Sequence, residues 1–207
     1  MVFVKKKTRY DKKAQLQVTE WVTTRGVLHR SGDKPARIWQ NGREEWWFNG
    51  ALHREGDKPA IYQSDSDGTF VFEHYFKGNL HRDNEQAAVS RYDGTVWRYE
   101  WYKHGLKHRD GDKPAVIYDW NSGKLVRIWF KQGRRHRENG PAFTRVQPWG
   151  DTREEWYYYG KRHRNFGFPA VICKDSLGVS TKETFLEHGK EYYCFRIFGF
   201  TMSWSYE

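Results

Sequence analysis

Six His-Arg dipeptides stand at nearly even intervals along the sequence, and their side chains could bind a metal, catalyse a reaction or form ion pairs. Successive pairs are 24 to 28 residues apart. The pairs are His29-Arg30, His53-Arg54, His81-Arg82, His108-Arg109, His136-Arg137 and His163-Arg164. Zinc requires histidine nitrogens about 2.0 to 2.1 Å from one ion, but equivalent atoms of stacked two-strand units lie about 10 Å apart. The spacing therefore argues against a metal shared by neighbouring copies, and we expect no metal site.

Catalysis by these residues is also disfavoured by what surrounds them. His81-Arg82-Asp83 and His108-Arg109-Asp110 spell the tripeptide of a kinase catalytic loop. The sequence has no glycine-rich phosphate loop, Asp-Phe-Gly or Walker lysine motif, and the tripeptide recurs as part of a repeat. We therefore expect neither enzymatic activity nor a cofactor.

A structural role explains the His-Arg pairs better. Each Arg is expected to pair with the acids placed next to it, which are Asp33, Glu55 and Asp57, Asp83, Asp110 and Asp112, or Glu138. Exposed pairs of this kind contribute only about 0 to 1 kcal/mol each, so they would set register and solubility more than stability. The His ring would pack against a Trp or Pro and bind a turn carbonyl.

The dipeptides belong to a longer repeated pattern, which must position them. A glycine precedes each His by three residues, at Gly26, Gly50, Gly78, Gly105, Gly133 and Gly160. A Pro-Ala follows five or six residues later, at Pro35, Pro59, Pro114, Pro141 and Pro169, and only the third copy has Ala87-Ala88 instead. Two adjacent rings precede the glycine, the first of them at Trp46, Trp101, Trp129 and Trp156. A fixed period of this kind predicts a repeat architecture.

The residue types within one repeat predict a β-hairpin. Each Pro-Ala is followed by strand formers, as in residues 115–118, and a turn signal such as Asp93-Gly94 separates them from a second strand. The signature glycines fit a second reversal that needs positive φ. Helical periodicity is absent. We predict an all-β fold, an elongated twisted antiparallel sheet of stacked hairpins, with no helix.

Composition adds expectations about domains and core. Residues 1–19 would form a basic N-terminal arm or capping strand, residues 20–191 about seven repeats, and residues 192–207 a closing hairpin over the last edge. With 11 Trp, 13 Tyr and 13 Phe, the core is predicted to be aromatic. One row of rings would form a continuous ladder along the sheet, while the segments from Gly to Pro-Ala cover the other face.

The repeat resembles a known family. The segment Trp46-Trp47-Phe48-Asn49-Gly50, continued through His53-Arg54 to Pro59-Ala60, resembles the variant MORN-type repeats of large DNA viruses, and the resemblance extends over about residues 20–190. Ordinary MORN repeats are shorter, nearer 23 residues, and lack the added His-Arg and Pro-Ala. The resemblance implies a single-layer hairpin array that acts as a protein-interaction scaffold, in some members with affinity for anionic lipid.

Charge and the remaining residue types leave two hypotheses for the partner. The chain carries a net charge of +10, and half of it lies in residues 1–25, where Lys5, Lys6, Lys7, Arg9, Lys12 and Lys13 could attract phosphates. The favoured hypothesis is a scaffold for another protein, and the alternative is nucleic-acid or anionic-membrane binding through this basic segment. No apolar run is long enough to span a membrane, and we expect no secretory signal at the start of the sequence. The two cysteines, Cys173 and Cys194, fit an intracellular protein.

Overall fold

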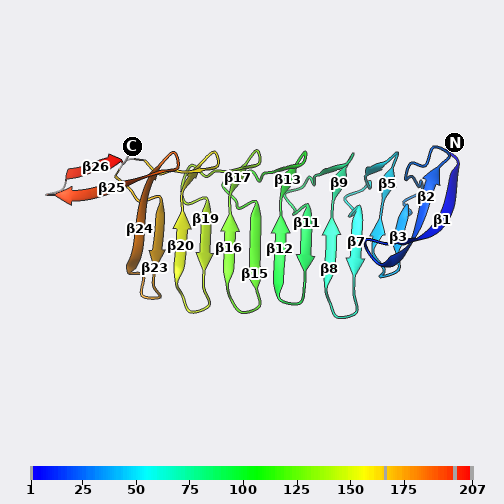
Figure 1. Cartoon of the computed structure of the whole chain (residues 1–207), viewed down its shortest axis with the longest axis horizontal. Coiled ribbons are helices and arrows are strands. Elements are labelled where there is room, and N and C mark those ends of the chain that lie inside the picture. Colours follow the sequence, from blue (N-terminus) through cyan, green and yellow to red (C-terminus); the bar gives the residue numbers. More distant parts are fainter. Residues whose placement is uncertain (1, 166, 198–199, 206–207) are drawn as a thin grey trace. The chain divides into compact units, whose positions relative to one another are not determined.

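The computed structural model describes residues 2–165, 167–197 and 200–205, and these residues form β-strands and turns with no helix. The chain divides into two compact units, Met1–Leu106 and Lys107–Glu207. Within each unit, long hairpins pair into an antiparallel sheet, and shorter hairpins lie along one edge of it (Figure 1). The predicted all-β class with stacked hairpins is confirmed. The described residues contain no helix long and apolar enough to cross a membrane.

Each unit has one long sheet in which every strand is antiparallel to its neighbours. The sheet of the first unit has the order β1 (Val4–Asp11), β2 (Leu16–Thr23), β3 (Arg37–Trp39), β4 (Glu44–Glu45), β7 (Ile61–Ser64), β8 (Phe70–Glu73), β11 (Val89–Tyr92) and β12 (Val96–Glu100). The sheet of the second unit has the order β15 (Val116–Trp120), β16 (Leu125–Ile128), β19 (Phe143–Val146), β20 (Thr152–Glu155), β23 (Val171–Lys174), β24 (Ser180–Glu187), β25 (Lys190–Ile197) and β26 (Phe200–Ser205).

Short strands of two residues form the second hairpin of each repeat. They are β5 (Trp47–Phe48) with β6 (Ala51–Leu52), β9 (Tyr75–Phe76) with β10 (Asn79–Leu80), β17 (Phe130–Lys131) with β18 (Arg134–Arg135), and β21 (Tyr157–Tyr158) with β22 (Lys161–Arg162), besides β13 (Tyr102–Lys103) and β14 (Leu106–Lys107). All six signature glycines have positive φ, from +79° to +96°. The residue before the glycine is also left-handed in several copies, as at Asn49 with φ of 48°. These x-Gly turns match the type I′ reversal that joins short antiparallel strands.

The core differs from the aromatic one that composition predicts. The face of each sheet that carries its buried side chains, here called the inner face, is filled by small aliphatic residues such as Val89 and Val116 and by carboxylates such as Glu100. Trp46, Trp129 and Tyr157 are the large buried rings of the described residues, whereas most other rings are partly exposed. A single-layer sheet cannot enclose so many rings, because each strand has only one covered face.

The opposite face, here called the outer face, carries a row of rings only in part. In the first unit Phe70 contacts Phe72, Tyr92 and Trp97, and Trp97 also stacks on Tyr99. In the second unit the equivalent positions hold residues such as Ile117, Leu125, Arg127 and Thr144. The predicted continuous ladder is therefore wrong, since the sequence supplies rings at these positions in only some repeats.

The C-terminal segment lies only partly within the described residues. β25 pairs with both β24 and β26, and its first residue is Lys190. Residues 198–199 and 206–207 of the expected closing hairpin lie outside the described residues. The same holds for the side chain of Cys194, whereas Cys173 is a free thiol.

Candidate interaction surface

The x-Gly turns of the short hairpins are completed by the preceding repeat. The amide of Gly50 donates to the carbonyl of Leu28 at 2.9 Å, and the amide of Asn49 donates to Nδ1 of His29 at 3.1 Å. Both backbone donors of the x-Gly turn thus find acceptors in the preceding repeat. Without these acceptors, two amides would lose their hydrogen bonds where the hairpins pack together.

The signature histidines all use this arrangement. In each, Nδ1 accepts the amide of the residue before the next glycine, at 3.1 to 3.5 Å. The pairs are His29 with Asn49, His53 with Lys77, His81 with His104, His108 with Gln132, His136 with Tyr159 and His163 with His188. An accepting Nδ1 requires a neutral ring with its proton on Nε2. The expectation that the ring binds a turn carbonyl is wrong, because the neighbouring turn presents an amide to it.

The other ring nitrogen points to a carboxylate two residues later. The Nε2 atom of His53 lies 2.8 Å from Glu55, and that of His108 lies 2.9 Å from Asp110. His81 lies 3.3 Å from Asp83 in the same way. These carboxylates were expected to pair with Arg, and instead they orient the histidine. They remain largely exposed at the surface.

A signature Arg such as Arg54 joins three parts of the structure. Arg54 stacks over Trp46 at 3.7 Å, and its Nη1 donates to the carbonyl of Pro59 at 3.2 Å. Its Nε and Nη2 bind Asp33 of the preceding repeat at 2.7 and 3.3 Å. Hydrogen bonds from Arg54 and Lys58 lower the pKa of Asp33 to about 2. The Arg therefore pairs one repeat back, because its side chain extends across the boundary between hairpins.

The same contacts recur in other copies. Arg30 stacks over Trp21, Arg137 over Trp129, and Arg164 over Trp156. Arg82 binds Asp57 and Arg137 binds Asp112 through two hydrogen bonds each. The carbonyls that accept from Nη1 in the other copies belong to Pro35, Ala87, Pro114, Pro141 and Pro169. Of the expected core rings, Trp46 and Trp129 are buried, and Trp101 and Trp156 are partly exposed.

A buried glutamate directly before the first ring is a feature that sequence reasoning missed. Glu155 is 4% exposed and accepts hydrogen bonds from Tyr157 at 2.7 Å, Arg153 at 2.6 Å and Arg162 at 2.9 Å. Burial raises the pKa of Glu155, but these hydrogen bonds outweigh it and hold the pKa below its usual value. Equivalent buried glutamates are Glu20, Glu45, Glu73 and Glu100.

The stability of the first unit should fall as the pH falls below about 6.5. His74 is buried, its Nδ1 lies 3.3 Å from the carbonyl of Ala88, and Arg82 and Asp57 are its charged neighbours. Burial and, less strongly, Arg82 lower the pKa of His74. Below its ordinary pKa the unfolded chain thus binds more protons than the folded chain, and acid favours unfolding.

Urea unfolding measured between pH 8 and pH 5 checks this prediction. The variant His74→Trp copies Trp46 and Trp101, which hold the same position in other repeats. It should show a smaller loss of free energy over this range than the original protein. Equal pH dependence in both proteins would contradict the prediction.

A surface hollow recurs between successive short hairpins. In the first unit, one hollow of about 320 Å³ is lined by Trp46, Phe48 and His53. The next, of about 330 Å³, is lined by the equivalent His74, Phe76 and His81. Arg54, Glu55 and Lys58 line both hollows and form the wall between them. In the second unit a hollow of about 270 Å³ has the same kind of lining, with Trp129, Phe130 and His136.

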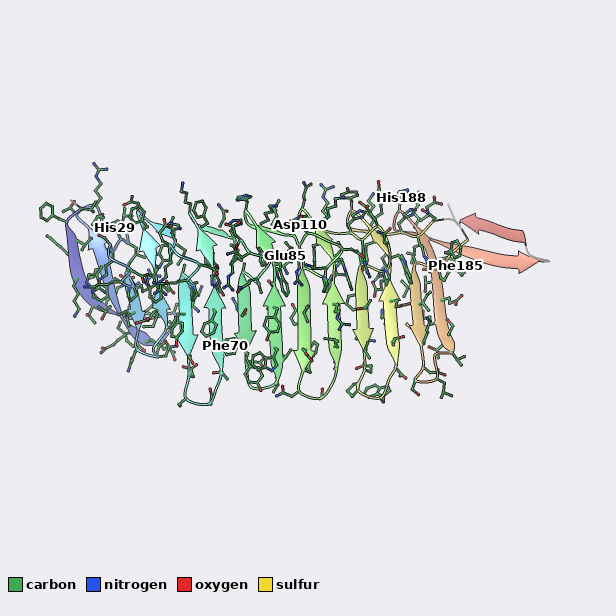
Figure 2. The ribbon with its side chains drawn as sticks, turned by 180° about the vertical axis from the view of Figure 1, so that it is seen from behind. His29, Phe70, Glu85, Asp110, Phe185 and His188 are labelled. Carbon is green, nitrogen blue, oxygen red and sulfur yellow. The ribbon has the colours of Figure 1, made fainter. Side chains whose placement is uncertain are left out.

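In each unit the hollows lie at one end of the long strands, where the signature loops meet the short hairpins. Figure 2 shows His29 and Asp110 near this end, while Phe70 lies toward the turns of the long hairpins. Exposed rings stand beside the hollows in the first unit, and 49% of Phe48 and 43% of Phe76 is accessible. The two hollows of the first unit therefore each offer an accessible ring next to an exposed carboxylate, Glu55, and a cation, Lys58, a mixture that suits a polypeptide ligand.

The basic N-terminal residues are placed mainly on β1 and divided between its two sides. Lys7 and Arg9 lie 3.4 and 3.2 Å from the buried Glu20, and Arg9 also binds Asp11. Lys6 lies 5.8 Å from the ring of Trp21. Lys5 on β1 and Lys12 and Lys13 in the following turn are exposed. The charges expected to attract phosphate are thus partly neutralised by acids of the same unit.

One cluster in the described part of the chain has the composition of a metal site. His163, Glu187 and His188 have ligand atoms within 4.8 Å of one another. However, the rings of His163 and His188 are stacked at 4.4 Å, and Nδ1 of His163 accepts the amide of His188. Metal binding through the other nitrogen would need Nδ1 to carry a proton, which breaks this hydrogen bond. The geometry is that of the histidine contact found in every repeat.

Comparison with known proteins adds no assignment, since the sequence matches no protein-family model and no curated protein. The resemblance to MORN-type repeats rests on the repeated residues themselves.

Proposed function

We propose that this protein is a non-enzymatic repeat scaffold that binds another protein along the edge carrying the hollows. Nδ1 of each signature His accepts a turn amide, and Nη1 of each signature Arg donates to a backbone carbonyl of its own loop, which supports a structural role for both residues. A structural or host-interaction protein of a large DNA virus is the setting that the MORN resemblance suggests.

The recurrence of one hollow carries this proposal. Equivalent hollows of adjacent repeats share the wall made by Arg54, Glu55 and Lys58, and two strands per repeat give a spacing of about 10 Å. An extended polypeptide covers this distance with about three residues. A single partner segment can therefore place equivalent side chains in successive hollows, and linked weak contacts add up to a stable complex.

The double variant Phe48→Lys and Phe76→Lys tests the proposal. Lys103 and Lys131 hold the equivalent position in other repeats, so the change follows the chain's own pattern. Tagged protein is used for quantitative capture with cross-linking from the cells in which it is naturally made. We expect the main captured protein to fall at least about tenfold, because two aromatic contacts are lost.

The matched control is Leu177→Ser, which changes an exposed apolar residue that lines none of the hollows described above. It should capture the same protein at the original level, and urea unfolding should confirm that both variants fold. Equal capture by all three proteins would contradict binding at the hollows. Capture of nucleic acid in place of protein would favour the alternative based on the basic segment.

A further inference from the structure

The outer face of four neighbouring strands in the first unit carries a cluster of rings, which we call the aromatic face. Its members are Tyr62 on β7, Phe70 and Phe72 on β8, Tyr92 on β11, and Trp97 and Tyr99 on β12. Neighbouring rings lie 4.4 to 6.3 Å apart. The hydrogen-bonded register Tyr92↔Trp97 and Tyr62↔Phe72 places them side by side across strands.

The aromatic face is open to solvent. Tyr62 and Trp97 are 38% and 36% exposed, and the other four rings are partly exposed. Contiguous apolar surface of this kind is typical of binding sites. The strands beneath it are paired on both sides along β8 and β11, so a ligand can bind only through side chains and not by adding a strand.

The charge around this face is negative, opposite to the charge of the whole chain. Asp67 and Asp93 are exposed in the turns that close its two hairpins. The two arginines of these strands, Arg91 and Arg98, lie on the inner face, where they bind Glu73 and Glu100. In these described strands no lysine or arginine stands on the outer face. A phosphate backbone would be repelled here, and a cationic ligand attracted.

We propose that the aromatic face binds an arginine-rich segment of another protein. A guanidinium group stacks on aromatic rings and forms two parallel hydrogen bonds to a carboxylate. The chain itself already contains this arrangement, because Arg54 stacks on Trp46 while it binds Asp33. On the aromatic face the rings and the two turn aspartates are present, and the partner supplies the arginines. This surface is separate from the hollows, so the proposal goes beyond the function proposed above.

Binding of fluorescent polyarginine, polylysine of equal length and single-stranded oligothymidine to the full chain tests the proposal. The key variant is Trp97→Leu with Tyr99→Arg, which copies Leu125 and Arg127 at the equivalent positions of the next repeat. We expect polyarginine to bind the original protein best. The double variant should weaken this binding at least about tenfold, since two ring contacts are lost.

A second variant isolates the charge. Asp67→Asn with Asp93→Asn keeps an acceptor oxygen for the turn amides that the aspartates now bind, and it should weaken binding about threefold at physiological salt. Tyr158→Lys removes an exposed ring from a short hairpin of the second unit and should change nothing. Equal polyarginine binding by Trp97→Leu/Tyr99→Arg and the original protein would overturn the proposal, as would oligothymidine binding that is lost in the same variant. Neither result would affect capture through the hollows.

Discussion

Replacing the buried carboxylate in the variant Glu155→Ala should lower the free energy of unfolding by about 3 to 5 kcal/mol. The change leaves the hydroxyl of Tyr157 and the guanidinium groups of Arg153 and Arg162 without their shared acceptor. Tyr157 is buried, so water cannot fully replace the lost hydrogen bond. The measurement is urea unfolding, in which the slope of the unfolding free energy against urea concentration should be the same for the variant and the original protein.

The chain provides a matched control for this prediction. In the fifth repeat, Val126, Ile128 and Phe130 replace the residues equivalent to Arg153, Glu155 and Tyr157, and they pack in an apolar cluster. The triple variant Arg153→Val, Glu155→Ile and Tyr157→Phe should therefore lie within about 1 kcal/mol of the original protein, because Glu155 disappears together with two of its partners and the third, Arg162, is 44% exposed and can be hydrated. A small loss for Glu155→Ala alone, or an equal loss for both variants, would contradict the role of the buried carboxylate.

The variant Trp129→Ala should cost about 3 to 5 kcal/mol of unfolding free energy. Trp129 is buried against Ala142 and Tyr157, its Nε1 donates to the carbonyl of Asp112 at 3.0 Å, and Arg137 stacks on its ring at 4.1 Å. Removing the ring leaves a cavity and takes the stacking surface from Arg137.

Trp149→Ala is the comparison for Trp129→Ala. Trp149 is 63% exposed in a turn of the second unit, and its loss should change the unfolding free energy by less than about 0.5 kcal/mol. Similar losses for the two variants, measured by urea unfolding, would show that the signature ring contributes nothing beyond an ordinary surface ring.

Local features of the fold could be predicted because they depend on neighbouring residues. The signature glycines adopt the positive φ that an x-Gly turn requires, as at Gly50 and Gly160. Strands begin directly after Pro-Ala, at Val116 and Val171 for example. Turn chemistry and strand propensity act within a few residues, so the sequence alone contains this information.

The contacts of the signature side chains could not be predicted because they join residues of different repeats. Arg54 binds Asp33, which is 21 residues earlier, in preference to the nearer Asp57. Such a choice depends on how one hairpin is offset against the next. The buried glutamates had a visible signal, since a Glu precedes the first ring in five copies, but hydrophobicity rules exclude carboxylates from a core unless their partners are known.

The histidine contacts give the array a direction. Each repeat completes the turn of the repeat that follows it. For example, His29 accepts the amide of Asn49, and the carbonyl of Leu28 accepts the amide of Gly50. A repeat added on the C-terminal side thus meets acceptors that are already in place. Loss of the first repeat would instead leave the turn of the next repeat with two amides that have no acceptor in a preceding repeat. The two ends of such an array therefore differ chemically: the N-terminal side of a repeat presents two turn amides, and its C-terminal side presents a histidine Nδ1 and a carbonyl.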